Sequence, residues 1–267
     1  MSSRPRVSIL IPTYNRADYL PQAIRSALAQ TYQDFELLIL DDASTDRSPE
    51  SVRGLLADRR VVYIKHPINL GISANRNSGI ARSKGEYLAM LDSDDLWIEA
   101  SKLQRQVDVL DADPDCGLVG THARVLDDRG VAIGTLRPRT DPDGIRRAML
   151  VRNQIVHSSV LLRRRALDRA GWYDTSLPIW EDYELWLRMG AVSRISNLPL
   201  FLTGYRRHAG NTSRFAEEKS LISYRRIYER HRHRYPHAAL LGMKVFLLGC
   251  QYHLQHPRDG RRRIETQ

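Results

Sequence analysis

Along residues 1–95, short apolar runs alternate with stretches that carry apolar residues at helical spacing. The apolar runs are residues 7–11, 35–40, 61–64 and 86–91, and the helical stretches are residues 20–28, 48–56 and 73–81. In the second helical stretch, which Ser48-Pro49-Glu50 opens, Val52, Leu55 and Leu56 form the expected buried face. Strands that are apolar throughout are typical of parallel sheets covered on both faces. The pattern predicts an α/β fold with a Rossmann-like, mostly parallel central sheet flanked by helices.

Beyond residue 96 the alternation weakens. The expected elements are a helix over residues 103–110, strands over residues 117–126, 158–162 and 201–205, and a helix that Trp180-Glu181-Asp182 opens and that runs to Met189. From Glu217 onward the pattern is helical and basic. A chain of 267 residues accommodates one α/β core with an appendage. We therefore predict a domain over residues 1–213, made of the halves 1–95 and 96–213, and a basic helical C-terminal extension over residues 214–267.

Charge is distributed unevenly along the chain. Residues 1–200 carry 27 Lys and Arg against 26 Asp and Glu, whereas residues 201–267 carry 14 against 5. A basic tail of this kind meets nucleic acid or an anionic membrane, or stays solvated. We favour a helical pair that packs on the core with a solvated basic face, and peripheral contact with an anionic membrane is the alternative. Because the charge is confined to the tail while the predicted strand ends are acidic, we expect no nucleic-acid partner.

The sequence also bears on location. Residues 1–6 lack the basic-then-apolar layout of a signal peptide, and the apolar stretch 238–250 is interrupted by Lys244 and is too short to span a bilayer. The two cysteines, Cys116 and Cys250, lie far apart, which fits a reduced compartment. We expect a cytoplasmic protein, with the inner face of the membrane as the place for any peripheral contact.

Polar clusters follow the predicted parallel strands. They are Thr13-Tyr14-Asn15, Asp41-Asp42, Asn69-Leu70-Gly71 and Asp92-Ser93-Asp94-Asp95. Each could be ordinary turn chemistry, since Asp, Asn and Gly favour turns. Their shared position argues for a site, because ligands of open α/β sheets bind beyond the carboxyl ends of the strands.

Asp92 and Asp94 suggest a metal in particular. On extended backbone, residues two apart project to the same side. Two carboxylates at a strand end suit Mg²⁺ or Mn²⁺, which proteins hold with one or two carboxylates while substrate phosphates supply further oxygens. A solvated acidic turn is the alternative.

These segments together resemble the family-two glycosyltransferases of GT-A fold. The resemblance covers residues 6–213 and rests on residues 7–15, residues 40–46, Asn69-Leu70-Gly71, Asn75-Arg76-Asn77, residues 92–95 and Glu181-Asp182. It implies transfer of a sugar from a nucleoside-diphosphate donor, with UDP favoured, to a saccharide or lipid-linked saccharide in polysaccharide or glycoconjugate assembly. The Gln-x-x-Arg-Trp motif of processive synthases is absent, so the resemblance is to members that add one sugar per encounter. The family resemblance also implies inversion at the anomeric centre.

The resemblance also implies residue roles. Thr13, Tyr14 and Asp42 would line the base pocket, Asn15 and Asn69 would belong to the same nucleotide-sugar site, and Asp92 would lie near the ribose. Asp94 and His208 would bind the divalent cation, Mn²⁺ or Mg²⁺, with Asp95 as a second carboxylate contributor. The half 1–95 would bind the donor and the half 96–213 the acceptor.

Asp182 would be the catalytic base, able to take the proton of the acceptor hydroxyl. Asp182 could instead be the N-cap of the helix that follows, and His208, in an arginine-rich loop, could be a solvated residue. Two other functions stay open: a nucleotidyltransferase on a similar fold, and a non-enzymatic nucleic-acid binder. The first lacks a Gly-rich, basic triphosphate loop after the first strand, where Thr13-Tyr14-Asn15 stands.

Overall fold

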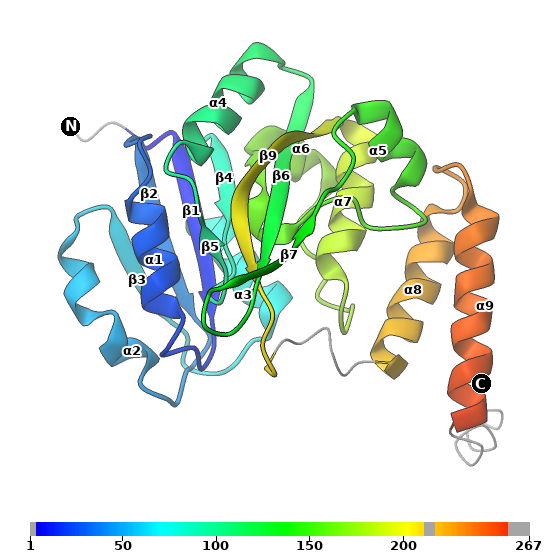
Figure 1. The fold of residues 1–267 in the computed structure, drawn as a ribbon, viewed down its shortest axis with the longest axis horizontal. Coiled ribbons are helices and arrows are strands. Elements are labelled where there is room, and N and C mark those ends of the chain that lie inside the picture. Colours follow the sequence, from blue (N-terminus) through cyan, green and yellow to red (C-terminus); the bar gives the residue numbers. More distant parts are fainter. Residues whose placement is uncertain (1–3, 211–216, 256–267) are drawn as a thin grey trace.

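In the computed structural model, which describes residues 4–210 and 217–255, helices cover both faces of one long sheet (Figure 1). The strands are β1 (Val7–Thr13), β2 (Phe35–Asp41), β3 (Val61–Lys65), β4 (Tyr87–Met90), β5 (Leu96–Trp97), β6 (Cys116–Leu126), β7 (Ala132–Leu136), β8 (Leu161–Arg163) and β9 (Arg194–Arg206). The α-helices are α1 (Leu20–Leu28), α2 (Ser48–Ser51), α3 (Ile72–Arg82), α4 (Lys102–Ala112), α5 (Pro142–Ala148), α6 (Arg164–Ala170), α7 (Glu181–Val192), α8 (Glu217–His231) and α9 (Ala238–Gln255). Short 3-10 helices lie at η1 (Arg53–Ala57) and η2 (His157–Ser159).

The described strands join in the order β3-β2-β1-β4-β8-β6-β9-β5, with β7 paired to β6. From β3 to β4 every pairing is parallel. From β4 to β8 and on to β6 the pairing is antiparallel, and β6 pairs with β9 in parallel. The parallel, helix-covered N-terminal half that the apolar runs predict is therefore confirmed, and a mixed half continues the same sheet.

The apolar strands are explained by burial on both faces. In β1, Ile9 and Ile11 belong to a buried cluster that includes Ile24 of α1, whereas Leu10 belongs to a second cluster that includes Trp186 of α7. Because successive side chains of a strand point to opposite faces, a sheet covered on both sides needs apolar residues at every position.

The two C-terminal helices, α8 and α9, lie side by side at one end of the molecule (Figure 1). Ile227 and Tyr235, from α8 and the connection after it, belong to the same buried cluster as Tyr183 and Trp186 of α7. Within the ranges the structure describes, no helix combines the length and apolarity of a membrane span. The predicted boundary at residues 213 and 214, and residues 256–267 of the extension, lie outside the described residues.

Several predicted elements differ from the structure. After Ser48 the chain forms α2 and then η1, in which Leu56 is 37% exposed, so the predicted buried face is wrong at that residue. Residues 158–162 divide between η2 and β8, and β9 begins at Arg194 instead of residue 201. The strands β5 and β7 and the helices α5 and α6 are not predicted. They are short, and β7 is largely exposed, so they carry little apolar periodicity.

Candidate functional site

The carboxyl ends of β2, β1 and β4 meet at one edge of the sheet because these strands are parallel neighbours. Thr13 ends β1 and lies opposite Asp41 of β2, and the Asp42 N–H donates to the carbonyl oxygen of Thr13 at 2.9 Å. Asp92 follows β4 at the same edge. The structure thus brings together the strand-end clusters that the sequence suggests as a site.

Left-handed backbone conformations gather at this edge. Asn15 (φ 53°) and Ala43 (φ 64°) follow β1 and β2, and Trp180 (φ 63°) precedes α7. Among the described non-glycine residues, His237 (φ 62°) is the fourth with positive φ. Such a conformation costs about 1–3 kcal/mol at a non-glycine residue and persists only where its surroundings hold it. The strain is therefore concentrated near the candidate site.

Asn15 and Asp42 hold the loops around the site. The Asn15 Oδ1 atom accepts hydrogen bonds from the N–H groups of Thr45 (2.9 Å) and Asp46 (3.2 Å). The buried Asp42 carboxylate accepts from the N–H groups of Leu70 (2.8 Å) and Gly71 (2.9 Å). Each Asp42 oxygen keeps a further lone pair, so this bracing leaves acceptor capacity for a ligand.

Thr13 and Tyr14 differ in exposure. The Thr13 hydroxyl is buried and has no hydrogen-bond partner in the described part of the chain. Tyr14 is 45% exposed at the same strand end. Asn69 is exposed, and its side chain accepts from the Gly71 N–H at 3.1 Å, an ordinary turn contact. A buried hydroxyl without a partner calls for an explanation, and a ligand that bonds to it is one.

Asp92, whose side chain is 28% exposed, is the centre of an ionic network that is otherwise largely buried. Arg76 donates from Nη2 to Asp92 Oδ1 at 2.8 Å and from Nη1 to Glu181 Oε1 at 2.5 Å. His157 Nδ1 lies 3.1 Å from Asp92 Oδ2, and its Nε2 lies 2.9 Å from the Tyr173 hydroxyl. Burial opposes the charged form of Asp92, but the neighbouring His157 and Arg76 hold the pKa of Asp92 well below its usual range. Arg76 thereby links the turn after β4 to the start of α7.

The segment after β4 is a turn instead of a continued strand. The Asp95 N–H donates to the Asp92 carbonyl oxygen at 3.0 Å, so the expectation of Asp92 and Asp94 on extended backbone is wrong. Asp95 points inward, where it accepts from the Ser158 hydroxyl and from the Arg206 N–H. Burial and the charges of Asp94 and Asp92 raise the pKa of Asp95 well above its ordinary value. Asp95 therefore braces the turn, and its carboxyl group is committed to protein contacts.

His208 faces Asp94. Its Nε2 atom lies 2.9 Å from Asp94 Oδ2, and 7% of its side chain is accessible, so the alternative of a solvated histidine is wrong. The Gly210 N–H donates to His208 Nδ1 at 3.1 Å, which leaves Nε2 as the nitrogen that faces the carboxylate. Arg16 Nε lies 3.6 Å from the same Asp94 oxygen.

The donor set of Asp94 and His208 fits a cation that is also held by substrate. Across the described residues, no three or more His, Cys, Asp or Glu side chains gather as a complete metal site. One carboxylate oxygen and one imidazole nitrogen are ligand types that Mn²⁺ accepts. Ions of this class take their remaining ligands from phosphates and water.

Asp182 is the second residue of α7. The N-cap is Trp180, without a side-chain cap, so the alternative of Asp182 as the N-cap is wrong. Its Oδ1 atom accepts from the Tyr183 N–H at 2.7 Å. Burial and the charge of Glu181 raise the pKa of Asp182 to about 6, against the opposing influence of His157 and Arg76. A carboxylate of this pKa can accept a proton near neutral pH.

No role is predicted from the sequence for Arg76, Tyr173 and Arg16. Arg76 lies inside the Asn75-Arg76-Asn77 segment of the resemblance, and that segment was its one available signal. Arg76, for example, pairs with Asp92, 16 residues away, and with Glu181, 105 residues away, and spacing along the chain does not reveal such contacts.

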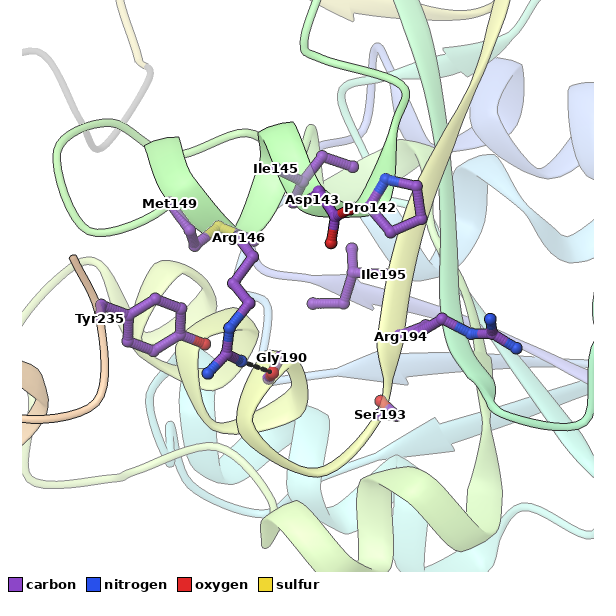
Figure 2. A pocket seen from close by; sticks show the side chains of 10 residues that line it. All are labelled: Pro142, Asp143, Ile145, Arg146, Met149, Gly190, Ser193, Arg194, Ile195 and Tyr235. Atoms are coloured by element: carbon purple, nitrogen blue, oxygen red, sulfur yellow. Dashed lines mark hydrogen bonds between the residues drawn. The ribbon is translucent and has the colours of Figure 1, made fainter.

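A separate cavity of about 130 Å³ lies at the other end of α7 (Figure 2). Figure 2 shows Arg146 beside the ring of Tyr235, with its guanidinium donating to the Gly190 carbonyl oxygen at 3.0 Å. Gly190 lies near the C-terminal end of α7, whereas Asp182 lies at the N-terminal end. The cavity is therefore not part of the candidate site.

Comparison with known proteins gives a consistent picture. The family profile described as "Glycosyl transferase family 2" matches residues 8–171. An "Uncharacterized glycosyltransferase" of Rickettsia felis is 32% identical over 72% of this chain, and the chain spans only 32% of that protein's length. The Escherichia coli protein "UDP-Glc:alpha-D-GlcNAc-diphosphoundecaprenol beta-1,3-glucosyltransferase WfaP" is 33% identical over 78% of this chain and 79% of its own.

Solved structures share the fold. S. aureus TarS 1–349 in complex with UDP-GlcNAc matches with a TM-score of 0.73 at 17% identity, over 97% of this chain and 77% of that chain. The mannosyltransferase PcManGT of Pyrobaculum calidifontis, in complex with GDP-Man and Mn²⁺, matches with a TM-score of 0.66 at 19% identity, over 92% and 70%. These matches confirm the predicted GT-A fold class.

Proposed function

The chain belongs to glycosyl transferase family 2, and from this premise we propose that it transfers a single sugar from a nucleoside-diphosphate donor to an acceptor hydroxyl with inversion. One observation carries the proposal: Arg76 joins Asp92 to Glu181, so the turn after β4 and the start of α7 belong to one buried network. Asp182 follows Glu181 directly. A donor-binding turn and a proton acceptor are thereby neighbours, as the reaction requires.

Donor binding is assigned to the half 1–95. Tyr14, exposed at the end of β1, would stack on the base. The Thr13 hydroxyl, which has no partner within the described residues, and the open lone pairs of Asp42 would hydrogen-bond to the base. Asn15 and Asn69 would shape this pocket through the loops they brace. We propose UDP as the nucleotide because a protein of this fold binds UDP-GlcNAc, and GDP is the competing choice because another binds GDP-mannose.

The leaving diphosphate is assigned to Asp94, His208 and Arg16. A divalent cation, Mn²⁺ or Mg²⁺, held by Asp94 and His208 would offset the charge that grows on the leaving group. Arg16, 3.6 Å from Asp94, is within reach of the same phosphates. Asp92, paired with Arg76 and His157, is ionised and would accept a hydrogen bond from the ribose.

Proton removal is assigned to Asp182. Its raised pKa of about 6 leaves it largely ionised at neutral pH and basic enough to take the acceptor proton as the new bond forms. In this scheme Asp182 is a base, and no protein group attacks the sugar to form a covalent intermediate. The acceptor hydroxyl then displaces the leaving group directly, which inverts the anomeric centre. The acceptor would enter from the half 96–213.

The acceptor is proposed to be a lipid-linked saccharide, because the name of WfaP gives a diphosphoundecaprenol-linked acceptor. A nucleotide-sugar donor and a lipid-linked acceptor would meet at the cytoplasmic face of a membrane. The outer face of α9 is apolar: Leu240, Met243, Phe246 and Leu247 are all exposed. We include a peripheral contact between this face and an anionic membrane in the proposal.

The test begins with donor binding. Thermal unfolding of the full chain is measured with UDP-sugars and with GDP-mannose, each with and without Mn²⁺. A ligand that binds the native state raises the unfolding temperature. We expect a UDP-sugar to raise the unfolding temperature, and to raise it further when Mn²⁺ is present. If GDP-mannose raises the unfolding temperature and no UDP-sugar does, the proposed nucleotide becomes GDP.

The same donor is then used to test the base. Asp182→Asn is expected to lower kcat by about 10²–10⁴-fold, the usual contribution of a positioned base, while the donor-induced rise in unfolding temperature persists. Asp108→Asn, on the exposed face of α4, is the matched control and should turn over like the wild type. Full activity of Asp182→Asn would refute the assignment.

A further inference from the structure

The C-terminal helix α8 contacts the segment that carries Asp182. The Trp180 indole N–H donates to the Ser220 hydroxyl at 3.1 Å, and the Trp180 ring stacks on Tyr224 with centroids 5.7 Å apart. Trp180 has left-handed backbone (φ 63°), which a bulky side chain adopts only under constraint. The constraint on this corner therefore comes in part from α8, and Asp182 lies two residues further on.

A second contact fixes the first turns of α7. Glu184 is fully buried, and its carboxylate accepts from Arg230 (2.9 Å) and His231 (3.1 Å) of α8 and from Arg188 (2.8 Å) of α7. A buried carboxylate needs such partners, because removing one leaves an uncompensated charge or acceptor. Glu184 lies half a turn from Asp182 on the same helix, so this ionic cluster fixes the rotation of α7 about its axis.

A third contact reaches further along α7. The Tyr235 hydroxyl, just after α8, donates to the Leu187 carbonyl oxygen at 2.6 Å. Figure 2 shows Tyr235 beside Arg146, which bonds to the Gly190 carbonyl oxygen. The polar contacts of α8 and of the connection after it thus run from Trp180, the N-cap of α7, to Leu187. A helix that only covered an apolar surface would not need polar partners at each of these points.

We propose that α8 is a positioning element for the base: through Trp180 and Glu184 it holds the first turn of α7 so that Asp182 faces the acceptor. This inference rests on the proposed function, since it takes Asp182 as the base. Ser220, Tyr224, Arg230 and His231 are positioning residues, because they act through Trp180 and Glu184 and do not reach the reacting atoms. The donor site, at the ends of β1, β2 and β4, lies outside their direct contacts.

The test measures kcat and the donor KM of each variant, because loss of positioning should lower kcat and leave the donor KM nearly unchanged. Tyr224→Ala removes the stacking under Trp180, and we expect kcat to fall about tenfold or more, since small displacements of a catalytic group are costly. The KM for the donor should stay within about twofold, because α8 does not contact the donor site. Tyr224→Phe keeps the ring and should restore kcat.

Two further variants complete the design. Ser220→Ala removes only the partner of the Trp180 N–H, and it should lower kcat less than Tyr224→Ala does without unfolding the protein. Arg225→Ala changes an exposed side chain of α8 that pairs with Glu229 of the same helix, and it should match the wild type. Thermal unfolding of each variant checks that it is folded at the assay temperature.

The possible results have distinct meanings. A wild type without turnover would refute the proposed function itself. An active wild type with unchanged kcat in both Tyr224→Ala and Ser220→Ala would overturn the positioning role alone. A rise in donor KM with unchanged kcat would also overturn it, because the contact would then serve donor binding.

Discussion

At the scale of single residues, the protonation of Asp182 should govern the pH dependence of turnover. Burial and the charge of Glu181 raise the pKa of Asp182 to about 6. A base acts in its deprotonated form, so kcat/KM should be constant above this pKa and fall about tenfold per pH unit below it. Glu181→Gln removes the charge that raises the pKa, so the midpoint should move to lower pH. An unchanged midpoint in that variant would mean that another group limits the rate.

The contact between Asp94 and His208 leads to a metal-binding prediction. Their side chains lie 2.9 Å apart and both are mostly buried. His208→Ala should weaken Mn²⁺ binding, measured by calorimetry in the presence of UDP, by about tenfold or more, as loss of a ligand or its support does. His233→Ala, an exposed histidine just after α8, is the control. Equal Mn²⁺ affinity in His208→Ala and the control would remove His208 from the ligand set.

The residues that the sequence could identify are those whose position alone is informative. Thr13, Asp42 and Asp94 follow strands, and parallel strands bring their ends together. Arg76 and His157 could not be found this way, because their importance lies in contacts with Asp92, Glu181 and Tyr173 across the fold. Asp95 is a residue whose position in the sequence is misleading. Its place in the acidic cluster suggests a metal contributor, but its buried carboxyl group accepts hydrogen bonds from Ser158 and Arg206.

At the scale of elements, the contact between α7 and α8 should make stability depend on pH. Burial disfavours the charged form of Glu184, but bonds from His231, Arg188 and Arg230 prevail and lower its pKa from 4.5 to about 2. A carboxyl group with a lowered folded-state pKa stabilises the fold above its unfolded pKa, and this contribution is lost as the pH falls toward the folded value. The shift corresponds to about 3 kcal/mol of unfolding free energy.

Urea unfolding at a series of pH values tests this contribution. Wild type should exceed Glu184→Gln in stability near pH 6, and the difference should shrink as the pH falls from about 4.5 to about 2. The exposed carboxylate of Glu229 pairs with Arg225 on the same helix, and Glu229→Gln should show a nearly constant difference from wild type. Parallel curves for wild type and Glu184→Gln would show that Glu184 titrates alike in the folded and unfolded chains.

The elements that the sequence predicts well are the long apolar ones. The runs that became β1, β2 and β4 are buried on both faces, and the helices α3 and α4 follow their apolar spacing. The two-residue β5 is specified by pairing with β9, a partner more than 100 residues away, which no local pattern records. The left-handed Trp180 is likewise set by its surroundings, since tryptophan has no local preference for that conformation.

At the scale of the whole molecule, one sheet unites the halves 1–95 and 96–213. The strand β8 pairs with β4 on one side and β6 on the other, so the mixed half grows directly from the parallel half. This junction brings His157 and Ser158, which precede β8, against the turn that follows β4. The sequence predicts both halves but not their joining strand order, because strand pairing is a long-range property.

The outer surface of α9 is the part of the molecule that most clearly lacks a covering partner in the described chain. Leu241, on one side of α9, is fully buried, whereas Leu240, Met243 and Leu247, at positions i, i+3 and i+7, share the exposed face with Phe246. A helix that is apolar on all sides is normally covered on all sides. Residues 230–258 contain no Asp or Glu and carry five Lys and Arg. Arg230 pairs with Glu184, but this stretch itself supplies no acidic partner for the other four cations. This positive charge favours an anionic lipid surface over a second copy of the same face.

Vesicle binding tests this surface. The full chain should co-sediment with vesicles that contain anionic lipid, more weakly with neutral vesicles, and less at high salt, because the attraction of each basic side chain to the surface is worth about 1 kcal/mol and is screened. Phe246→Gln with Leu247→Gln should abolish most of the binding. Leu56→Gln, which changes an exposed leucine of η1, should leave it unchanged. Indifference to lipid charge, together with a dimer in solution that the α9 variant dissociates, would assign the face to a second copy of the chain instead.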